Sequence, residues 1–328
     1  MIANLNKKIF VAGHAGMVGS ALIRELNRRY YKNIIIANRQ ELDLENQKSV
    51  QDFLRKEKPD EVYVAAARVG GIFANNNYPA EFIYQNLIIA SNIIKSCFDN
   101  KISKLLFLGS SCIYPKHSDQ PMKEQNLLSG YLEKTNEPYA IAKIAAIKLC
   151  ESFNRQYGKK FNIDYRCVMP TNLYGKGDNY DNKNSHVIPA LINRFHQAKQ
   201  KNNTYVKVWG SGNPKREFMY VDDLASACVF LMNLKKNEYY HRLSKNSVHI
   251  NVGSGYEVTI KNLAILISKI VGYDGKIIFD EKYPDGTPRK LLDSTIINSL
   301  GWKPHIDLES GLKMTYKYYL NEVSHNEK

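Results

Sequence analysis

Two side chains able to exchange protons, Tyr139 and Lys143, stand four residues apart in "EPYAIAK". Pro138 and the apolar pattern after it predict a helix that begins here, so both side chains lie on one face. A phenol titrates near ~10 in water, and a nearby ammonium stabilises its charged form. The pair therefore suits proton transfer near neutral pH, although an ordinary helix-surface pair has the same spacing.

A second stretch, "KLLFLGSSCIYP", ends an apolar run in two hydroxyls and a thiol. A hydroxyl at a strand end, such as Ser110 or Ser111, either satisfies a local backbone group or binds a ligand oxygen. Cys112 is either a small core residue or a proton-transfer group whose pKa sets its reactivity. His186, in an Asn-rich loop, is by itself equally consistent with an ordinary surface position.

A third motif, "GHAGMVG", places Gly13, Gly16 and Gly19 between an apolar run and a helical pattern. This is a GxxGxxG variant of the dinucleotide-binding fingerprint. Gly13 permits the tight turn, Gly16 lets the backbone approach a pyrophosphate, and Gly19 lets the helix contact the strand. The helix N-terminus adds oriented N–H groups, so the stretch predicts a dinucleotide site.

The end of the second predicted strand bears on the choice between NAD and NADP. NAD sites usually carry an acid there for the ribose 2′-hydroxyl, whereas this sequence has Asn38 and Arg39. Arg39 suits a 2′-phosphate, which favours NADP(H). Glu41 and Asp43 lie close by and are alternative partners for the ribose or adenine.

The elements that must position these motifs alternate along the first half of the chain. Short unbroken apolar runs predict buried strands at 8–13, 33–38, 61–67 and 104–111. Helical patterns cover 20–30, 47–57 and 84–100. This order predicts an α/β fold, a Rossmann-type doubly wound parallel sheet.

The regularity weakens after about Pro170, where "YGKGDNYDNKNSH" predicts a loop and 187–201 a helix. We interpret residues 1–170 as an NADP-binding Rossmann domain, with returning elements around 216–256. Residues 171–328 form an interleaved, smaller C-terminal α/β substrate lobe.

Composition excludes several classes of protein. The 328 residues are 44% hydrophobic, and no segment approaches the ~20 apolar residues of a membrane helix or a secretory signal. A cytoplasmic enzyme without membrane contact follows as the expectation. The five cysteines are odd in number and irregularly spaced, so neither disulfides nor a metal site is predicted. The formal charge of +14 is scattered among acids, which disfavours nucleic acid as a partner.

Together these motifs resemble the extended short-chain dehydrogenase/reductases and, within them, the GDP-L-fucose synthase family. The resemblance covers nearly the whole chain. One departure is Ala15, where some members place a basic residue beside the cofactor phosphate. The resemblance rests on "GHAGMVGSA", "VYVAAARVGGIFANNNYPAEFIYQN", "KLLFLGSSCIYP", "EPYAIAK", "MPTNLYG", "NSHVIPALI", "WGSG", "REF", "VDDLA" and "DGTPRKLLD".

The resemblance implies roles for five side chains in the NADPH-dependent reduction of a GDP-linked 4-keto sugar. Ser110 would hydrogen-bond the ketone, Tyr139 would protonate it, and Lys143 would hold the cofactor ribose and lower the tyrosine pKa. Cys112 and His186 match the family's acid–base pair for inversion at C3 and C5, next to the ketone.

The resemblance also implies the binding residues and the assembly. Extended members commonly pair the Tyr139 helix and the 84–99 helix into a four-helix interface, so a homodimer is expected. Substrate would contact Val187, Arg194, Trp209, Arg216 and Lys290. The cofactor would contact Gly13, Gly16, Met17, Val18, Gly19, Asn38, Arg39, Ala66, Lys143, Pro170, Asn172, Leu173 and His186.

Related enzymes with other activities are expected to carry different residues at a few of these motif positions. A 4,6-dehydratase normally has an Asp-Glu pair where this chain has Ser111 and Cys112, and a 4-epimerase usually has an acid where it has Asn38 and Arg39. A non-catalytic dinucleotide-binding relative would lose the Ser, Tyr and Lys set. A dedicated 4-reductase of a 6-deoxyhexose or heptose, without epimerase activity, stays open.

Overall fold

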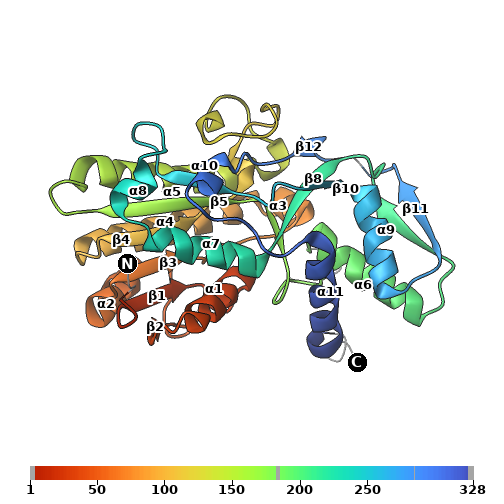
Figure 1. Cartoon of the computed structure of the whole chain (residues 1–328), viewed down its shortest axis with the longest axis horizontal. Coiled ribbons are helices and arrows are strands. Elements are labelled where there is room, and N and C mark those ends of the chain that lie inside the picture. Colours follow the sequence, from red (N-terminus) through yellow and green to blue (C-terminus); the bar gives the residue numbers. More distant parts are fainter. Residues whose placement is uncertain (1–3, 182–184, 284, 324–328) are drawn as a thin grey trace.

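The computed structural model describes residues 4–181, 185–283 and 285–323. A parallel sheet of six strands forms the larger body (Figure 1). These strands are short apolar runs, as expected where both faces of a sheet are covered. In spatial order they are β2 (Asn33–Ile35), β1 (Lys8–Ala12), β3 (Glu61–Val64), β4 (Lys104–Leu108), β5 (Asp164–Pro170) and β9 (His249–Val252).

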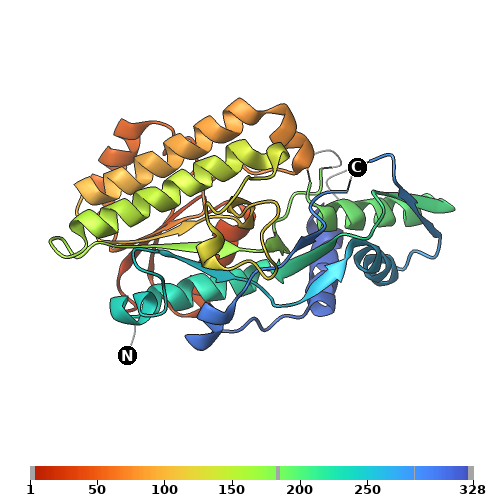
Figure 2. The ribbon, with the colours of Figure 1, turned by 90° about the horizontal axis from the view of Figure 1, so that it is seen from above.

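Helices cover both faces of this sheet (Figure 2). On one face, α2 (Gln47–Glu57), α4 (Pro79–Asp99) and α5 (Glu137–Tyr157) bury their apolar sides in one core. On the other face, α1 (Met17–Arg28) and α7 (Val221–Asn233) pack together in a second core. The predicted doubly wound α/β sheet is confirmed.

The C-terminal lobe has a core of its own, built around a four-stranded sheet and a two-stranded sheet. The four-stranded sheet comprises β6 (Asn172–Tyr174), β8 (Lys215–Tyr220), β10 (Glu257–Thr259) and β12 (Arg289–Lys290), and β7 (Tyr205–Trp209) pairs with β11 (Lys276–Asp280). The lobe's helices are α6 (Val187–Gln200), α9 (Ile260–Val271) and α11 (Leu308–Tyr318), followed by the π-turn η4 (Tyr319–Val323).

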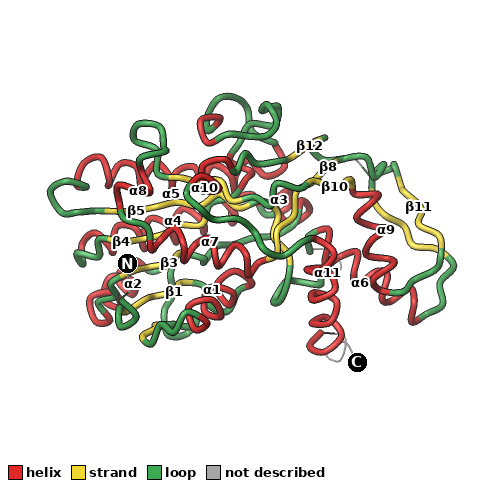
Figure 3. Tube along the Cα trace, in the orientation of Figure 1, coloured by secondary structure: helices red, strands yellow, loops and turns green. Residues whose placement is uncertain are grey.

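Shorter elements complete the chain. The segment between β4 and α5 is mostly loop (Figure 3), broken by the 3₁₀ turns η1 (Ser111–Ile113), η2 (Glu124–Asn126) and η3 (Lys134–Asn136). Short helices elsewhere are α3 (Ile72–Asn77), α8 (Lys236–Tyr240) and α10 (Thr295–Ser299). In the part of the chain that the structure describes, none of the helices combines the length and apolar character that spanning a bilayer requires.

Predicted and observed elements differ mainly at their ends. The second strand was expected over 33–38 but stops at Ile35, and Ile36 is half exposed, because β2 lies at the sheet edge and has one neighbour. Helix α4 starts at Pro79, five residues before the expected start. Strand β9 joins the main sheet from within the second half of the chain, in the region expected to return. The division near residue 170 stays a prediction.

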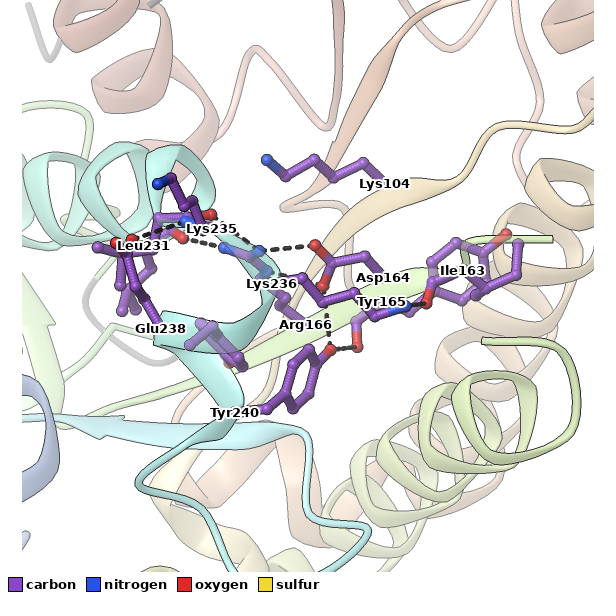
Figure 4. A network of polar contacts seen from close by, with 12 residues as sticks. Lys104, Ile163, Asp164, Tyr165, Arg166, Leu231, Lys235, Lys236, Glu238 and Tyr240 are labelled. Atoms are coloured by element: carbon purple, nitrogen blue, oxygen red, sulfur yellow. Dashed lines mark hydrogen bonds and ion pairs between the residues drawn. The ribbon is translucent and has the colours of Figure 1, made fainter. Parts of the chain in front are cut away.

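A closed polar network lies at the amino end of β5 (Figure 4). Asp164 and the fully buried Arg166 form a two-pronged ion pair, with N–O distances of 2.9 and 2.6 Å. Arg166 also donates to the Leu231 and Leu234 carbonyls at the end of α7. Tyr240 donates to Asp164 at 3.1 Å, so this network fixes α7 and α8 to the sheet.

Candidate active site

The first group of predicted site residues follows the carboxyl end of strand β4. Ser110 directly precedes the turn η1, and its Oγ lies 2.7 Å from the Cys112 Sγ. All five cysteines are free, and Cys97, Cys150, Cys167 and Cys228 are buried whereas Cys112 is only partly so. The Cys112 thiol is therefore the one in contact with both solvent and a neighbouring hydroxyl. Ser111 is buried, which favours Ser110 as the ligand-facing serine.

Helix α5, which packs on one face of the sheet and contacts the turn η1, brings Tyr139 and Lys143 to the same place. The Lys143 ammonium is buried, donates to the Leu108 carbonyl at 2.8 Å, and lies 5.6 Å from the Tyr139 ring centroid. Tyr139 shares a hydrogen bond with Ser110. The structure thus gathers the four predicted residues of β4 and α5 around one point.

The electrostatics of this cluster differ in one respect from the sequence-based expectation. Burial, and then the neighbouring Cys112, raise the pKa of Tyr139 above its ordinary value, and the Ser110 hydrogen bond only partly offsets the rise. The expected lowering by Lys143 is wrong for the protein without cofactor, because the ammonium bonds the Leu108 carbonyl instead of the phenol. Burial lowers the pKa of Lys143 to about 8. A phenol that stays protonated at neutral pH is suited to donate a proton.

His186 lies at the start of α6 in the C-terminal lobe, close enough to Lys290 to feel its charge. It precedes α6 as an N-cap that makes no side-chain capping bond, so its ring is left for other contacts. Residue His186 is exposed, yet desolvation by the groups around its ring, followed by the charge of Lys290, lowers its pKa. Lys290 also acts electrostatically on Cys112. Cys112 and His186, 74 positions apart in sequence, are therefore both within electrostatic range of the same cation.

The glycine turn has the shape that a pyrophosphate requires. Gly13 has φ +83°, and a Cβ there would meet the Ala66 backbone N at 2.6 Å. A Cβ on Gly19 would lie 2.0 Å from the Gly13 carbonyl. Gly16 has only that carbonyl nearby, at 3.5 Å, so its outer side is open. Helix α1 begins here with no acid in its first turn and no side-chain cap, which leaves its N–H groups for an anion.

The end of β2 offers one cation toward a ribose phosphate. Arg39 is exposed and pairs with Glu45 at 3.1 Å. Glu41 accepts from the Asn38 backbone N at 2.8 Å, and Asp43 accepts from the Glu45 backbone N at 3.0 Å. Arg39 is the exposed cation at this strand end, and its ion pair with Glu45 must open before it can bind a phosphate.

The other predicted cofactor residues lie along the same edge. Met17 and Val18 form the first turn of α1, and Ala66 follows β3 beside Gly13. Pro170 ends β5, and Leu173 lies in β6. The Asn172 side chain instead donates to the Glu217 carbonyl at 2.8 Å, an interaction that connects the neighbouring strands β6 and β8 of the lobe.

Unpaired cations line the lobe opposite this edge. Arg216 and Lys290 are direct neighbours in the parallel pairing of β8 with β12. Arg194 lies over the Trp209 ring at 4.7 Å. Burial lowers the pKa of all three cations, and among the described residues none of them pairs with a carboxylate. Such cations suit a pyrophosphate, which supplies the missing charge. Val187 contributes apolar packing at the start of α6.

Comparison with known proteins agrees with this geometry. Residues 9–253 match the model of the NAD dependent epimerase/dehydratase family. The chain belongs to this family. It is 56% identical over 314 residues to the GDP-L-fucose synthase of Escherichia coli strain K12, which covers 96% of this chain and 97% of that protein.

Two further relatives define the group within the family. The GDP-L-colitose synthase of Yersinia pseudotuberculosis is 40% identical over 97% of this chain and 100% of its own. The solved structure of a GDP-mannoheptose C4 reductase from Campylobacter jejuni with NADP bound is 38% identical, with a TM-score of 0.87 over 97% of this chain and 99% of that one. The predicted resemblance to the GDP-L-fucose synthase family, and the prediction that the chain is an enzyme, are confirmed.

The sequence analysis did not predict two further residues of this region, Tyr283 and Glu217. Tyr283 stacks on Trp209, with ring centroids 4.5 Å apart and planes 14° from parallel. It lies in the same Pro- and Gly-marked segment as Lys290, a signal that could have indicated it. Glu217, fully buried, accepts from the backbone N of Gly255 at 2.7 Å and of Leu292 at 3.0 Å. Nothing in its spacing distinguishes it from an ordinary strand residue.

Proposed function

We propose that this protein reduces the C4 ketone of a GDP-linked 4-keto-6-deoxy sugar with NADPH, and that it also epimerises the sugar at C3 and C5. The observation that carries the proposal is the 2.7 Å contact between Ser110 and Cys112, next to Tyr139 and Lys143. A hydroxyl that can bind a ketone and a partly exposed thiol that can act on its α-carbons meet at one point.

For reduction, the side chains supply binding and a proton. Ser110 donates a hydrogen bond to the ketone oxygen, and Tyr139 transfers its proton to that oxygen as negative charge develops. The buried Lys143 ammonium stabilises the resulting phenolate, and solvent restores the proton. When bound, the dihydronicotinamide supplies the hydride to C4.

For epimerisation, the same polarised ketone acidifies the C–H bonds at C3 and C5. Cys112, as thiolate, takes a proton from one face of the carbon, which leaves an enolate whose oxygen Ser110 and Tyr139 hydrogen-bond. His186, as imidazolium, returns a proton to the opposite face, which inverts the centre. Each step conserves protons, so only the reduction consumes a reductant.

The nucleotide part of the substrate is proposed from the unpaired cations. Arg216 and Lys290, side by side on β8 and β12, would bind the pyrophosphate. The stack of Arg194, Trp209 and Tyr283 offers a planar surface for the base. The printed names of the relatives, a GDP-L-fucose synthase and a GDP-L-colitose synthase, support guanosine diphosphate as that nucleotide.

The finer properties of the enzyme are part of the same proposal. NADP(H) fits the open glycine turn and Arg39, and NADP is the cofactor bound to the C4 reductase structure. A homodimer would cover the outer faces of α4 and α5, where Tyr84 and Ile141 are exposed. We place the enzyme in the cytoplasm, where nucleotide sugars and NADPH are made.

The test is product analysis in deuterated water with a GDP-4-keto-6-deoxymannose substrate and NADPH. We expect deuterium at C3 and C5 before hydride transfer to C4. Cys112→Ser should abolish this exchange, because serine does not ionise near neutral pH, while reduction of an already epimerised ketone continues. Cys150→Ser, a change at a buried thiol of α5, is the matched control and should leave the exchange intact.

One alternative is favoured by a specific observation, the likeness to a GDP-mannoheptose C4 reductase. If the wild-type enzyme reduces its ketone with no solvent deuterium at C3 or C5, it is a dedicated 4-reductase. Cys112 would then be a pocket residue that positions the sugar. Failure to reduce any GDP-linked 4-keto sugar would contradict both readings.

A further inference from the structure

The turn that carries Cys112 is held by different parts of the fold before and after the thiol. Before it, the Gly109 backbone N donates to a carbonyl of β5 at 2.9 Å, so the chain still belongs to the main sheet. After it, the chain leaves the sheet, and Tyr114 is the first residue beyond the turn. Tyr114 is buried, and its hydroxyl donates to the Asn251 Oδ1. The thiol therefore lies between a bond within the sheet and a bond between two side chains.

The acceptor of that second bond, Asn251, connects three separate segments. It lies in β9 and is fully buried. Its Nδ2 donates to the Met122 carbonyl at 2.9 Å and to the Asp293 carbonyl at 3.2 Å. With the bond from Tyr114, both the oxygen and the nitrogen of this amide are used. One side chain thus joins the turn after β4, the β4–α5 segment and the chain that follows β12.

The chain that follows β12 also fixes a proposed substrate cation, because it directly continues the strand of Lys290. The Met122 backbone N donates to the Leu291 carbonyl, and the Asp293 backbone N donates to the Met122 carbonyl, both at 2.8 Å. Cys112 and Lys290 border one small cavity. The same amide therefore holds the turn with the thiol and the strand with the cation in one arrangement.

The groups of this junction are suited to hold other residues and not to exchange protons themselves. Burial, and then the charge of Glu124, raise the pKa of Tyr114 well above its ordinary value, so the phenol stays a donor. The Asn251 backbone N is held in turn by the Glu124 Oε1 at 3.0 Å. A carboxamide does not titrate near neutral pH, so neither Tyr114 nor Asn251 competes with a thiolate as base.

The residues proposed for reduction are held in another way. Ser110 directly follows the sheet, and Tyr139 and Lys143 lie on α5, which packs on it. In residues 4–181, 185–283 and 285–323, none of these three hydrogen-bonds the Tyr114–Asn251 pair. We propose that Asn251, acting through Tyr114, is a positioning residue that holds the Cys112 thiol for proton transfer at C3 and C5 and is not required for ketone reduction. This inference rests on the proposed function.

The test separates the two activities in Tyr114→Phe, which removes the bond and keeps the ring. With GDP-4-keto-6-deoxymannose in deuterated water and no NADPH, we expect deuterium incorporation at C3 and C5 to slow by roughly tenfold, because a slightly displaced base transfers protons poorly. The turnover number for reduction of an already epimerised ketone with NADPH should stay within about threefold of the wild-type value.

A double-mutant cycle checks that the two residues act as one. Asn251→Ala should show the same split between exchange and reduction. The double variant should lose no more exchange activity than Asn251→Ala alone, since both changes remove the same bond. If Asn251→Ala does not fold, Tyr114→Phe decides the question by itself.

A matched control and a local measurement exclude a general loss of structure. Tyr165→Phe removes another buried phenol bond, to the Ile102 carbonyl at 3.0 Å, at the amino end of β5. Each single Tyr→Phe variant should lower the melting temperature by roughly 2 °C, but Tyr165→Phe should leave both rates unchanged. In Tyr114→Phe, amide hydrogen exchange should become several-fold faster in residues 111–116 and stay constant in β4.

Three results would overturn the inference: unchanged deuterium incorporation at C3 and C5 in Tyr114→Phe, equal losses of incorporation and reduction, or additive losses in the double variant. Deuterium incorporation by the wild type supports the proposed epimerase activity whatever the variants show. A wild type that reduces the ketone without incorporating deuterium overturns that activity, and this inference with it.

Discussion

At the amino end of the central sheet the buried charged and polar side chains are paired with one another, whereas at the carboxyl end similar side chains are incompletely paired. At the amino end, Asp164, Arg166 and Tyr240 bond one another and the surrounding carbonyls (Figure 4). At the carboxyl end, Lys143 has one backbone partner and Cys112 is partly exposed. Burial lowers the pKa of Lys143 to about 8, whereas the carboxylate partner of Arg166 raises the pKa of that guanidinium despite its complete burial.

This difference separates charges that hold the fold from charges that are available for chemistry. A buried ion pair with every donor satisfied has nothing left to offer a ligand. Groups that are desolvated but incompletely paired change their protonation readily and bind whatever supplies the missing partner. The carboxyl end of a doubly wound sheet is also where ligands usually bind.

The largest expected effect comes from a phenol-to-phenyl exchange at each end. Tyr139→Phe should lower the turnover number for ketone reduction by roughly 10²–10⁴-fold with little change in stability, because the proton donor is lost. The matched variant Tyr240→Phe should keep turnover and lower the unfolding free energy by about 1 kcal/mol, since it removes the bond to Asp164. Turnover above a tenth of the wild-type value in Tyr139→Phe would contradict its role as principal donor.

A charge removal at the amino end should cost stability instead of activity. Asp164→Asn leaves the fully buried Arg166 without its counter-charge and should lower the unfolding free energy by about 3–5 kcal/mol, measured by urea denaturation. The folded fraction should turn over at the wild-type rate. Adding Arg166→Met should recover part of the lost stability, because the unpaired buried charge is then gone. A double variant as unstable as Asp164→Asn alone would speak against this account.

A smaller effect is expected where a buried carboxylate supports the cations that we propose bind the substrate. Glu217 binds the backbone of Leu292, two residues after Lys290, and it adjoins Arg216 on β8. Glu217→Gln replaces one acceptor with a donor that faces backbone N–H groups, so we expect KM for the nucleotide sugar to rise about tenfold. A fall in kcat with constant KM would contradict the positioning role.

The smallest expected effect is at the exposed Arg39. Arg39→Ala should raise KM for NADPH by several-fold, roughly up to tenfold, and leave KM for NADH nearly constant, because solvent screens an exposed charge. Glu45→Gln should act in the opposite direction, since it frees Arg39 from its ion pair. Equal changes for both cofactors would remove the 2′-phosphate role.

Much of the site was accessible from the sequence because its parts are local. The Gly13–Gly19 turn, the Tyr139–Lys143 spacing and the strand end at Ser110 each depend on neighbouring residues and on one helix or strand. Resemblance to the family supplied Cys112 and His186, whose joint position near Lys290 no spacing indicates. The pKa of Tyr139 was predicted in the wrong direction, because the phenol's burial and the bond between Lys143 and Leu108 depend on the packed fold.

The sequence by itself determined the alternation of strands and helices, because apolar periodicity reports which faces are buried, and it determined where the glycines permit a close approach. Only the tertiary structure decided how the remaining polar groups are used. Asp164, Glu217 and Asn136 are ordinary polar residues in the sequence, yet one closes an ion pair, one joins backbone segments, and one is left with a free acceptor. Whether a buried polar group finds a partner depends on segments distant in the chain, so packing alone makes that choice.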